Sequence, residues 1–312
     1  MENEIWQGLP WEYFTKFISL RADRFAILEE ILKKARLDFN ILDIAGNRHI
    51  FIYKEPLKRR MDIPPPGPGI ILTAHYDRYE GSPGANDNSA GVFILLETAM
   101  NLKKKGIKNW GIIFTDKEEL KPGEGILKQG SYSLANMIKT MGMGNSKIYC
   151  FDVCGTGDSL LVSSTLDYLL RREGKGLRTQ KSLNELRKNA LNTAAEIKSL
   201  KAYMVPAPFS DDAGFFRAGI AAQTITMLPF KEYNRLSMEL LGSPECIEVL
   251  VNAELWHNAK NNFIPETWRI LNSSKDNIRR LTPEYYPLVR NFAEALCIKE
   301  DPESAYTPNN PL

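Results

Sequence analysis

The sequence is poor in histidine and cysteine and has no long apolar run. Only three of its 312 residues are histidine and four are cysteine. Four cysteines are too few for a disulfide framework in a chain of this length, which favours a reducing compartment, and we expect the cytoplasm. No stretch approaches the ~18 apolar residues of a membrane-spanning helix. The start lacks a basic segment followed by an apolar one, so we expect no signal peptide.

An excess of charge of one sign is also missing. The 40 basic and 38 acidic residues leave a net charge of +2. Nothing in the composition therefore calls for nucleic acid or an anionic membrane as a partner, and it leaves the oligomeric state open. The hydrophobic fraction of 43% suits a globular protein that can bury a large core. We expect a single domain over residues 1–312.

Hydrophobic periodicity predicts two helices and a hairpin at the start. Apolar residues recur at helical spacing over 11–20 and 21–35. Two strand-like runs, 41–44 and 49–53, flank a short turn signal. Residues 1–60 therefore hold N-terminal helices and a hairpin. The proline-rich segment 64–69 is a connector that cannot be helical.

From residue 70 onward, strand-like and helix-like segments alternate. The predicted strands lie near 70–74, 110–115, 147–153, 202–206 and 222–228, and the predicted helices near 89–105, 130–139 and 282–298. Such alternation predicts an α/β fold with a mostly parallel or mixed central sheet and helices on both faces. The charged segment 171–201 has a helical pattern, and we interpret it as a covering helix in preference to a lid. Residues 164–204 are therefore a possible helical insertion.

Histidine and carboxylate side chains gather where the predicted strands end. His75 and Asp77 follow the first of these strands, and Asp87 lies in the Gly- and Asn-rich loop after it. Glu118-Glu119 and Asp152 follow the next two strands. Each acid alone would be read as a cap, turn or solvated loop residue. Together, imidazole and carboxylates at one edge of a sheet indicate a divalent metal site.

Three other residues invite a functional reading that we do not favour. Cys150 and Cys154 flank Asp152 and could form a metal pair, but unpaired cysteines are usually buried apolar residues. His49 matches no motif and lies in the predicted hairpin. We interpret it as a surface residue.

The order of the motifs resembles peptidase family M28, the zinc aminopeptidases with two co-catalytic metals. The resemblance rests on four blocks, AHYDRYEGSPGANDNSAGV, FTDKEELKPGEGILKQGSYSLA, FDVCGTGD and FSDDAGFFRAGIAAQTIT, within about residues 69–226. It implies a three-layer sandwich of the zinc-exopeptidase kind. It also implies hydrolysis of the N-terminal bond of a peptide or small aminoacyl substrate.

The resemblance implies the metal ligands. His75 and Asp152 would bind one ion, Asp87 would bridge two ions, and Glu119 would bind the second. A cis peptide bond between Asp87 and Asn88 is also implied. Nitrogen and oxygen ligands without a thiolate fit one or two Zn2+ ions, with Co2+ or Mn2+ as alternatives.

The resemblance also implies two residues that serve the chemistry. Glu118 would be the general base that takes a proton from the attacking water. Asp77 would accept a hydrogen bond from the second ring nitrogen of His75 and so fix the tautomer of the ring.

The chain departs from the family where the second metal site is completed. The family places a histidine there, in a His-Thr-x-x-Asp segment before the last helix. The surroundings of Asp276 match that segment, and the histidine position then holds Asn272, which we favour over His257. An amide oxygen is a poorer zinc ligand than imidazole, so the second site would be weakened or empty. Asp212 likewise replaces the histidine of the family's Ser-Asp-His piece.

Two other functions therefore stay open beside the aminopeptidase. One is a glutaminyl-cyclase-like acyl transferase with a single zinc, and the other is a metal-impaired binding protein on the same scaffold. The Glu118-Glu119 pair favours hydrolysis over cyclisation. Two bound metals favour the aminopeptidase, one leaves the cyclase open, and none favours the binding protein.

Overall fold

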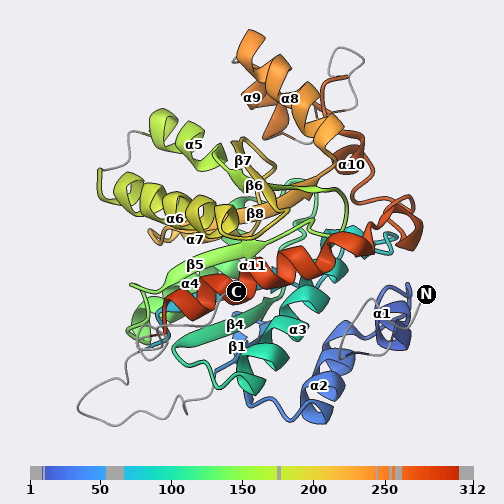
Figure 1. The fold of residues 1–312 in the computed structure, drawn as a ribbon, viewed down its shortest axis with the longest axis vertical. Helices are drawn as coiled ribbons and strands as arrows, with labels where there is room; N and C mark the ends of the chain where they lie inside the picture. Colours follow the sequence, from blue (N-terminus) through green and yellow to red (C-terminus); the bar gives the residue numbers. More distant parts are fainter. Residues whose placement is uncertain are drawn as a thin grey trace.

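Figure 1 shows a computed structural model in which the central feature is a mixed sheet between helices. It describes residues 9, 11–53, 67–173, 177–243, 245–252, 255–256 and 262–301. Eight strands of this part of the chain pair in the order β1-β2-β4-β3-β5-β8-β6-β7. The four central strands run parallel: β4 (Trp110–Thr115), β3 (Ile70–His75), β5 (Lys147–Phe151) and β8 (Ala222–Leu228). The expected α/β fold is confirmed.

The two edges of the sheet are formed differently. At one edge, β1 (Phe39–Ile44) and β2 (Asn47–Ile52) form the expected hairpin, and β2 joins β4 in antiparallel register. At the other edge, β6 (Ser159–Ser163) pairs antiparallel with β8 and parallel with β7 (Lys201–Val205). The sequence analysis missed β6, because its five residues are too few to show a period of their own.

Alternate side chains of the central strands point into two cores. Ile70 and Leu72 belong to the core beneath α3 (Ala90–Lys104) and α11 (Tyr286–Lys299), which lie side by side in Figure 1. Ile71 belongs to the core beneath α4 (Gly130–Thr140) and α7 (Asp211–Arg217). Both faces of the sheet are therefore covered, and the polar residues that follow the strands lie at its edge.

The remaining helices extend these layers. They are α1 (Trp11–Phe17), α2 (Arg24–Lys34), α5 (Thr165–Glu173), α6 (Leu177–Ala195), α8 (Phe230–Gly242), α9 (Cys246–Leu250) and α10 (Glu266–Arg269). Helix α6 buries Leu183, Leu186 and Ala190 and contacts α11 and β7. Among the described residues, no helix has the length and apolar character needed to span a bilayer.

His49 is not a surface residue, contrary to the expectation. Its side chain on β2 is fully buried, and its Nδ1 accepts a hydrogen bond from the backbone N–H of Asp116 at 3.1 Å. The start of α4 covers the ring, because a Cβ added at Gly130 would lie 3.1 Å from the imidazole Cε1. Cys150 and Cys154 are buried free thiols. Residues 64–66 of the proline-rich connector, and His257, lie outside the described residues.

Candidate metal centre

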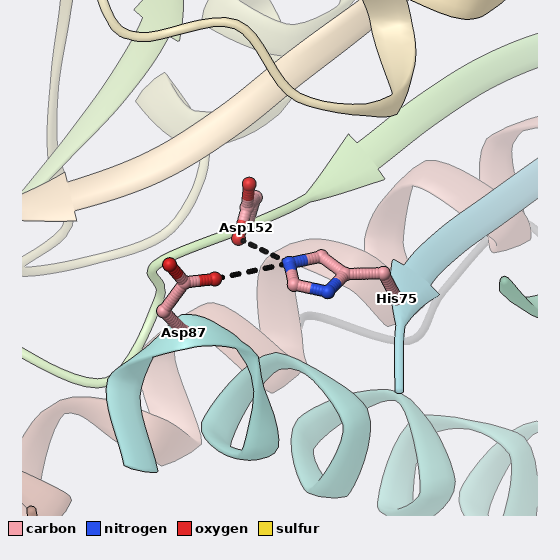
Figure 2. A group of neighbouring side chains, drawn as sticks. All are labelled: His75, Asp87 and Asp152. Atoms are coloured by element: carbon pink, nitrogen blue, oxygen red, sulfur yellow. Dashed lines mark hydrogen bonds and ion pairs between the residues drawn. The ribbon is translucent and has the colours of Figure 1, made fainter. Parts of the chain in front are cut away.

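The structure brings one histidine and two aspartates together at the carboxyl edge of the sheet. Nε2 of His75 lies 3.1 Å from Oδ1 of Asp87 and 3.3 Å from Oδ1 of Asp152 (Figure 2). One ligand atom from each residue lies within 4.8 Å of the others, and all three are buried. His75 ends β3, Asp152 directly follows β5, and Asp87 lies in the short helical turn η1 (Ala85–Ser89).

This cluster of side chains fits a divalent cation. Burial alone would lower the pKa of His75, but Asp152, Asp77 and Asp87 around the ring raise that pKa well above its usual value. Burial also raises the pKa of Asp87. Several buried carboxylates disfavour one another's charge, and a cation among them would compensate it. Imidazole nitrogen and carboxylate oxygen are donors that zinc accepts.

The loop that carries Asp87 is held from two directions. The carboxylate of Asp276 accepts from the backbone N–H groups of Asn86 at 2.8 Å and Asp87 at 3.0 Å. The side chain of Asn88 donates to the carbonyl oxygen of Phe151 at 2.8 Å, one residue before Asp152. The Asp87–Asn88 peptide bond is cis, as the family resemblance implies. These contacts tie the loop to the end of β5.

Arg24 of α2 holds the same loop from its other side. Its guanidinium is 5% exposed and donates to the carbonyl oxygens of Tyr76 at 3.0 Å, Asp77 at 2.9 Å and Pro83 at 2.7 Å. It also donates to Oγ of Ser89 at 2.9 Å. Burial lowers the pKa of Arg24 to about 9.

The sequence analysis missed Arg24, although a signal was present. Arg24 shares a helical stripe with Leu28 and Ile31, at positions i, i+4 and i+7, and all three are buried. An arginine on the apolar stripe of a helix becomes buried, and a buried guanidinium needs hydrogen-bond acceptors. Its position therefore predicts acceptors where the helix packs.

Asp77 links His75 to the glutamate pair that follows β4. Its Oδ1 lies 3.4 Å from Nδ1 of His75, and its carboxylate accepts from the backbone N–H groups of Glu118 at 3.1 Å and Glu119 at 3.0 Å. Burial would raise the pKa of Asp77, but the hydrogen bond and charge of His75, together with the two backbone hydrogen bonds, lower it. Burial raises the pKa of Glu118 and of Glu119 well above its usual range. Glu118 also accepts from the side-chain amide of Gln129 at 3.0 Å.

Asn272 lies beside Glu119. With its amide nitrogen turned toward that residue, Asn272 donates to Oε1 at 3.0 Å and to Oε2 at 3.2 Å. The structure therefore places an amide next to the carboxylate that the family resemblance assigns to the second metal. His257, the alternative, lies outside the described residues.

Two further buried acids lie at the start of α7, where the family pattern has an acid and a histidine. Oδ2 of Asp211 accepts from Oγ1 of Thr115 at 2.5 Å, and Oδ1 of Asp212 accepts from the backbone N–H of Ser210 at 3.0 Å. Burial raises the pKa of Asp211 to about 6 and that of Asp212 to about 7. With the carboxyl group of Asp212 in place of the family's imidazole, this region has one more acidic side chain.

The fold and this site are those of an α/β protein with a candidate divalent-metal centre. The sequence profile of peptidase family M28 matches residues 61–282, and the chain belongs to this family. A comparison with curated protein sequences gives no match.

Solved structures of low sequence identity share the fold. A zinc aminopeptidase from Bacillus subtilis has a TM-score of 0.51 at 20% identity, over 83% of this chain and 51% of that one. The LapA aminopeptidase of Legionella pneumophila has a TM-score of 0.59 at 16% identity, over 96% and 71%. A glutaminyl cyclase from Porphyromonas gingivalis has a TM-score of 0.59 at 14% identity, over 93% and 96%. This chain thus spans about half the length of the Bacillus subtilis enzyme.

Proposed function

We propose that this protein is a metal-dependent exopeptidase that hydrolyses the N-terminal peptide bond of peptides or small aminoacyl substrates. One observation carries the proposal. His75, Asp87 and Asp152 converge at the carboxyl edge of the sheet, in a chain that belongs to peptidase family M28. Two of the similar solved structures are aminopeptidases, and one of these is a zinc enzyme.

In this proposal His75, Asp87 and Asp152 hold a zinc ion, with Co2+ or Mn2+ as alternatives. Zinc, when bound, supplies a Lewis acid that polarises the scissile carbonyl and lowers the pKa of water. Glu119 and Asn272 border a second metal position. Because the amide of Asn272 is a weak donor to zinc and can instead donate to Glu119, we expect the second position to bind metal less tightly.

Two side chains near the proposed ion, those of Asp77 and Glu118, have further roles in the proposed reaction. Asp77 faces Nδ1 of His75, which leaves the lone pair of Nε2 directed at Asp87 and Asp152. Glu118 takes the proton of the attacking water and passes it to the leaving amine as the peptide bond breaks. Burial raises the pKa of Glu118 above its usual value, which makes its carboxylate a stronger base.

Removal of the proposed base tests this mechanism. Zinc-loaded wild type should hydrolyse members of a panel of aminoacyl anilides, and Glu118→Gln should keep its zinc but lose roughly 10²- to 10⁴-fold in kcat, because an amide cannot accept the proton. The matched control is Glu124→Gln in the same connection, whose carboxylate accepts from the backbone of Lys121. Unchanged turnover in Glu118→Gln would contradict the assigned role.

A second candidate function is glutaminyl cyclisation. It is favoured by the similarity to the cyclase over nearly the whole of both chains, and by Asn272 in the histidine position. A peptide with an N-terminal glutamine separates the two reactions. The cyclase would release ammonia and keep every residue of the peptide, whereas the exopeptidase would release free glutamine.

A further inference from the structure

Gln129 is buried against the glutamate that we propose as the base. It lies between the 3-10 turn η2 (Ile126–Lys128) and α4, and it is 3% exposed. Its Nε2 donates to Oε1 of Glu118 at 3.0 Å. The same nitrogen lies 3.4 Å from the carbonyl oxygen of Ser210 and 3.5 Å from that of Glu118.

These neighbours fix which end of the amide faces Glu118. Two carbonyl oxygens can only accept hydrogen bonds, so the nitrogen of Gln129 must be the atom that faces them. On the opposite side, Oε1 of Gln129 accepts from Oγ of Ser131 at 2.9 Å. A reversed amide would set oxygen against the two carbonyl groups of Glu118 and Ser210.

Gln129 is closely packed on the side that faces α7. Gly214 of α7 lies directly against it, because a Cβ added there would fall 2.2 Å from Oγ of Ser131 and 2.9 Å from Oε1 of Gln129. Helices α4 and α7 are in contact at this point. The amide is thus held by its neighbours before it contacts Glu118, which is the condition for a precise supporting contact.

Besides burial, charges of both signs act on the carboxylate of Glu118: His75 lowers its pKa, and Glu119, Asp152 and Asp211 raise it. A lysine or arginine beside Glu118 would hold it, but its positive charge would also weaken the carboxylate as a base. A neutral amide donates a hydrogen bond without adding a charge.

We infer that Gln129 is a positioning residue for Glu118: it holds Oε1 of the carboxylate and leaves Oε2 as the atom that takes the proton. The inference rests on the proposed function of Glu118. It assigns a role in the reaction to a side chain that approaches the site from the start of α4, outside the strand ends that carry the metal cluster.

Gln129→Met tests the inference, because methionine has about the same length but no amide donor. We expect kcat to fall about 10- to 100-fold, as for the loss of a hydrogen bond to a charged group, while KM and bound zinc stay within about twofold. The matched control is Gln223→Met. Gln223 is 1% exposed and donates to the carbonyl oxygens of Ser163 and Thr224 at 2.8 and 2.9 Å. The Gln223→Met variant should be less stable than the wild type but keep the wild-type kcat.

A double variant separates positioning from simple damage to the fold. In the Glu118→Gln background there is no base to position, so adding Gln129→Met should lower the residual kcat less than about twofold. An equal loss of kcat in both backgrounds would overturn the inference. So would wild-type kcat in Gln129→Met, or a rise in KM with kcat unchanged.

Crystal structures of wild type and Gln129→Met test the positioning role even if no activity can be measured. The inference expects the Glu118 carboxylate to rotate away from its wild-type position when the amide is lost. If wild type hydrolyses no substrate in the panel, the proposed function fails. If the Glu118 carboxylate stays in place in Gln129→Met, the positioning role fails, whatever the activity.

Discussion

At the scale of single residues, the two described histidines show that neighbours, not burial alone, decide how a side chain titrates. His75 and His49 are both buried. Carboxylates surround His75 and raise its pKa. His49 instead accepts a backbone hydrogen bond through Nδ1, and burial lowers its pKa to about 4. One ring is suited to a cation site, and the other must stay neutral in the folded protein.

His49 should therefore destabilise the protein in acid. In the unfolded chain its pKa is about 6.5, so between pH 6.5 and 4 the unfolded state binds a proton that the folded state does not. Stability contributed by this residue is complete above pH 6.5 and is lost as the pH falls. Between pH 7 and 5 we expect a loss of about 2 kcal/mol. Urea unfolding of His49→Gln should show a smaller acid loss than wild type, and identical losses would contradict the assignment.

Asn272 sets the metal stoichiometry in our proposal. Its amide lies 3.0 and 3.2 Å from the oxygens of Glu119, and we propose that it takes the place of the family's histidine. Asn272→His should raise bound zinc toward two ions per chain, because imidazole donates to zinc far better than an amide. Elemental analysis of both proteins after the same zinc loading measures this. Two tightly bound ions in the wild type would show that the second position does not need a histidine here.

At the scale of elements, two arginines connect the loop that carries Asp77 and Asp87 to α2 and to the segment just before α2. Arg24 reaches from α2 to the loop that carries Asp77 and Asp87. Arg78 reaches back from that loop to the carbonyl oxygen of Ser19 at 2.7 Å. The loop geometry thus depends on a helix more than fifty residues earlier in the chain.

Arg24→Met should consequently loosen the site as well as the fold. The loop carbonyls would lose their donor, at a cost of about 3 kcal/mol or more in the free energy of unfolding. Zinc affinity should fall as well. Arg290→Met is the control, because Arg290 is 7% exposed and pairs with Glu97 at 3.1 Å, between α11 and α3. Urea unfolding and chelator competition measure the two effects. Equal zinc affinity in both variants would show that the hydrogen bonds of Arg24 stabilise the fold and have no separate effect on metal binding.

Elements with a clear local signal were mostly predictable, and elements defined by their packing were not. The hairpin follows from its turn signal, the central strands follow from short apolar runs, and α3 follows from a helix-like run. Strand β6 is five residues long, and its pairing with β8 depends on contacts far away in the chain. Helices α8 and α9 were missed as well. In α8 a signal was present, because Tyr233, Leu236 and Leu240 recur at helical spacing and pack in one core with Leu250 of α9.

At the scale of the whole molecule, the sequence could predict those residues of the candidate site that directly follow parallel strands. Parallel strands deliver the residues that follow them to one edge, so His75, Asp87 and Asp152 could be expected to meet. Gln129 and Arg24 could not, because their roles depend on how helices pack onto that edge. The family motif pointed to the residues that we propose as ligands, whereas their supporting contacts required the fold.

The buried acids also connect metal binding to the stability of the whole molecule. Asp77, Asp87, Glu118 and Glu119 lie largely buried around the imidazole of His75, so a bound cation should stabilise the folded state. Free zinc at about 100 times its dissociation constant should add about 2.7 kcal/mol to the free energy of unfolding. In a protein of this size that corresponds to several degrees in Tm.

Thermal unfolding in chelator and in excess zinc measures this stabilisation. His75→Asn removes the imidazole at the centre of the three-residue cluster, so its Tm should respond little to zinc. His49→Gln lies outside the three-residue cluster and should respond as the wild type does. An equal zinc response in wild type and His75→Asn would mean that the stabilising ion binds elsewhere. The proposed centre at the ends of β3 and β5 would then be wrong, because an ion bound there would lose its imidazole ligand in this variant.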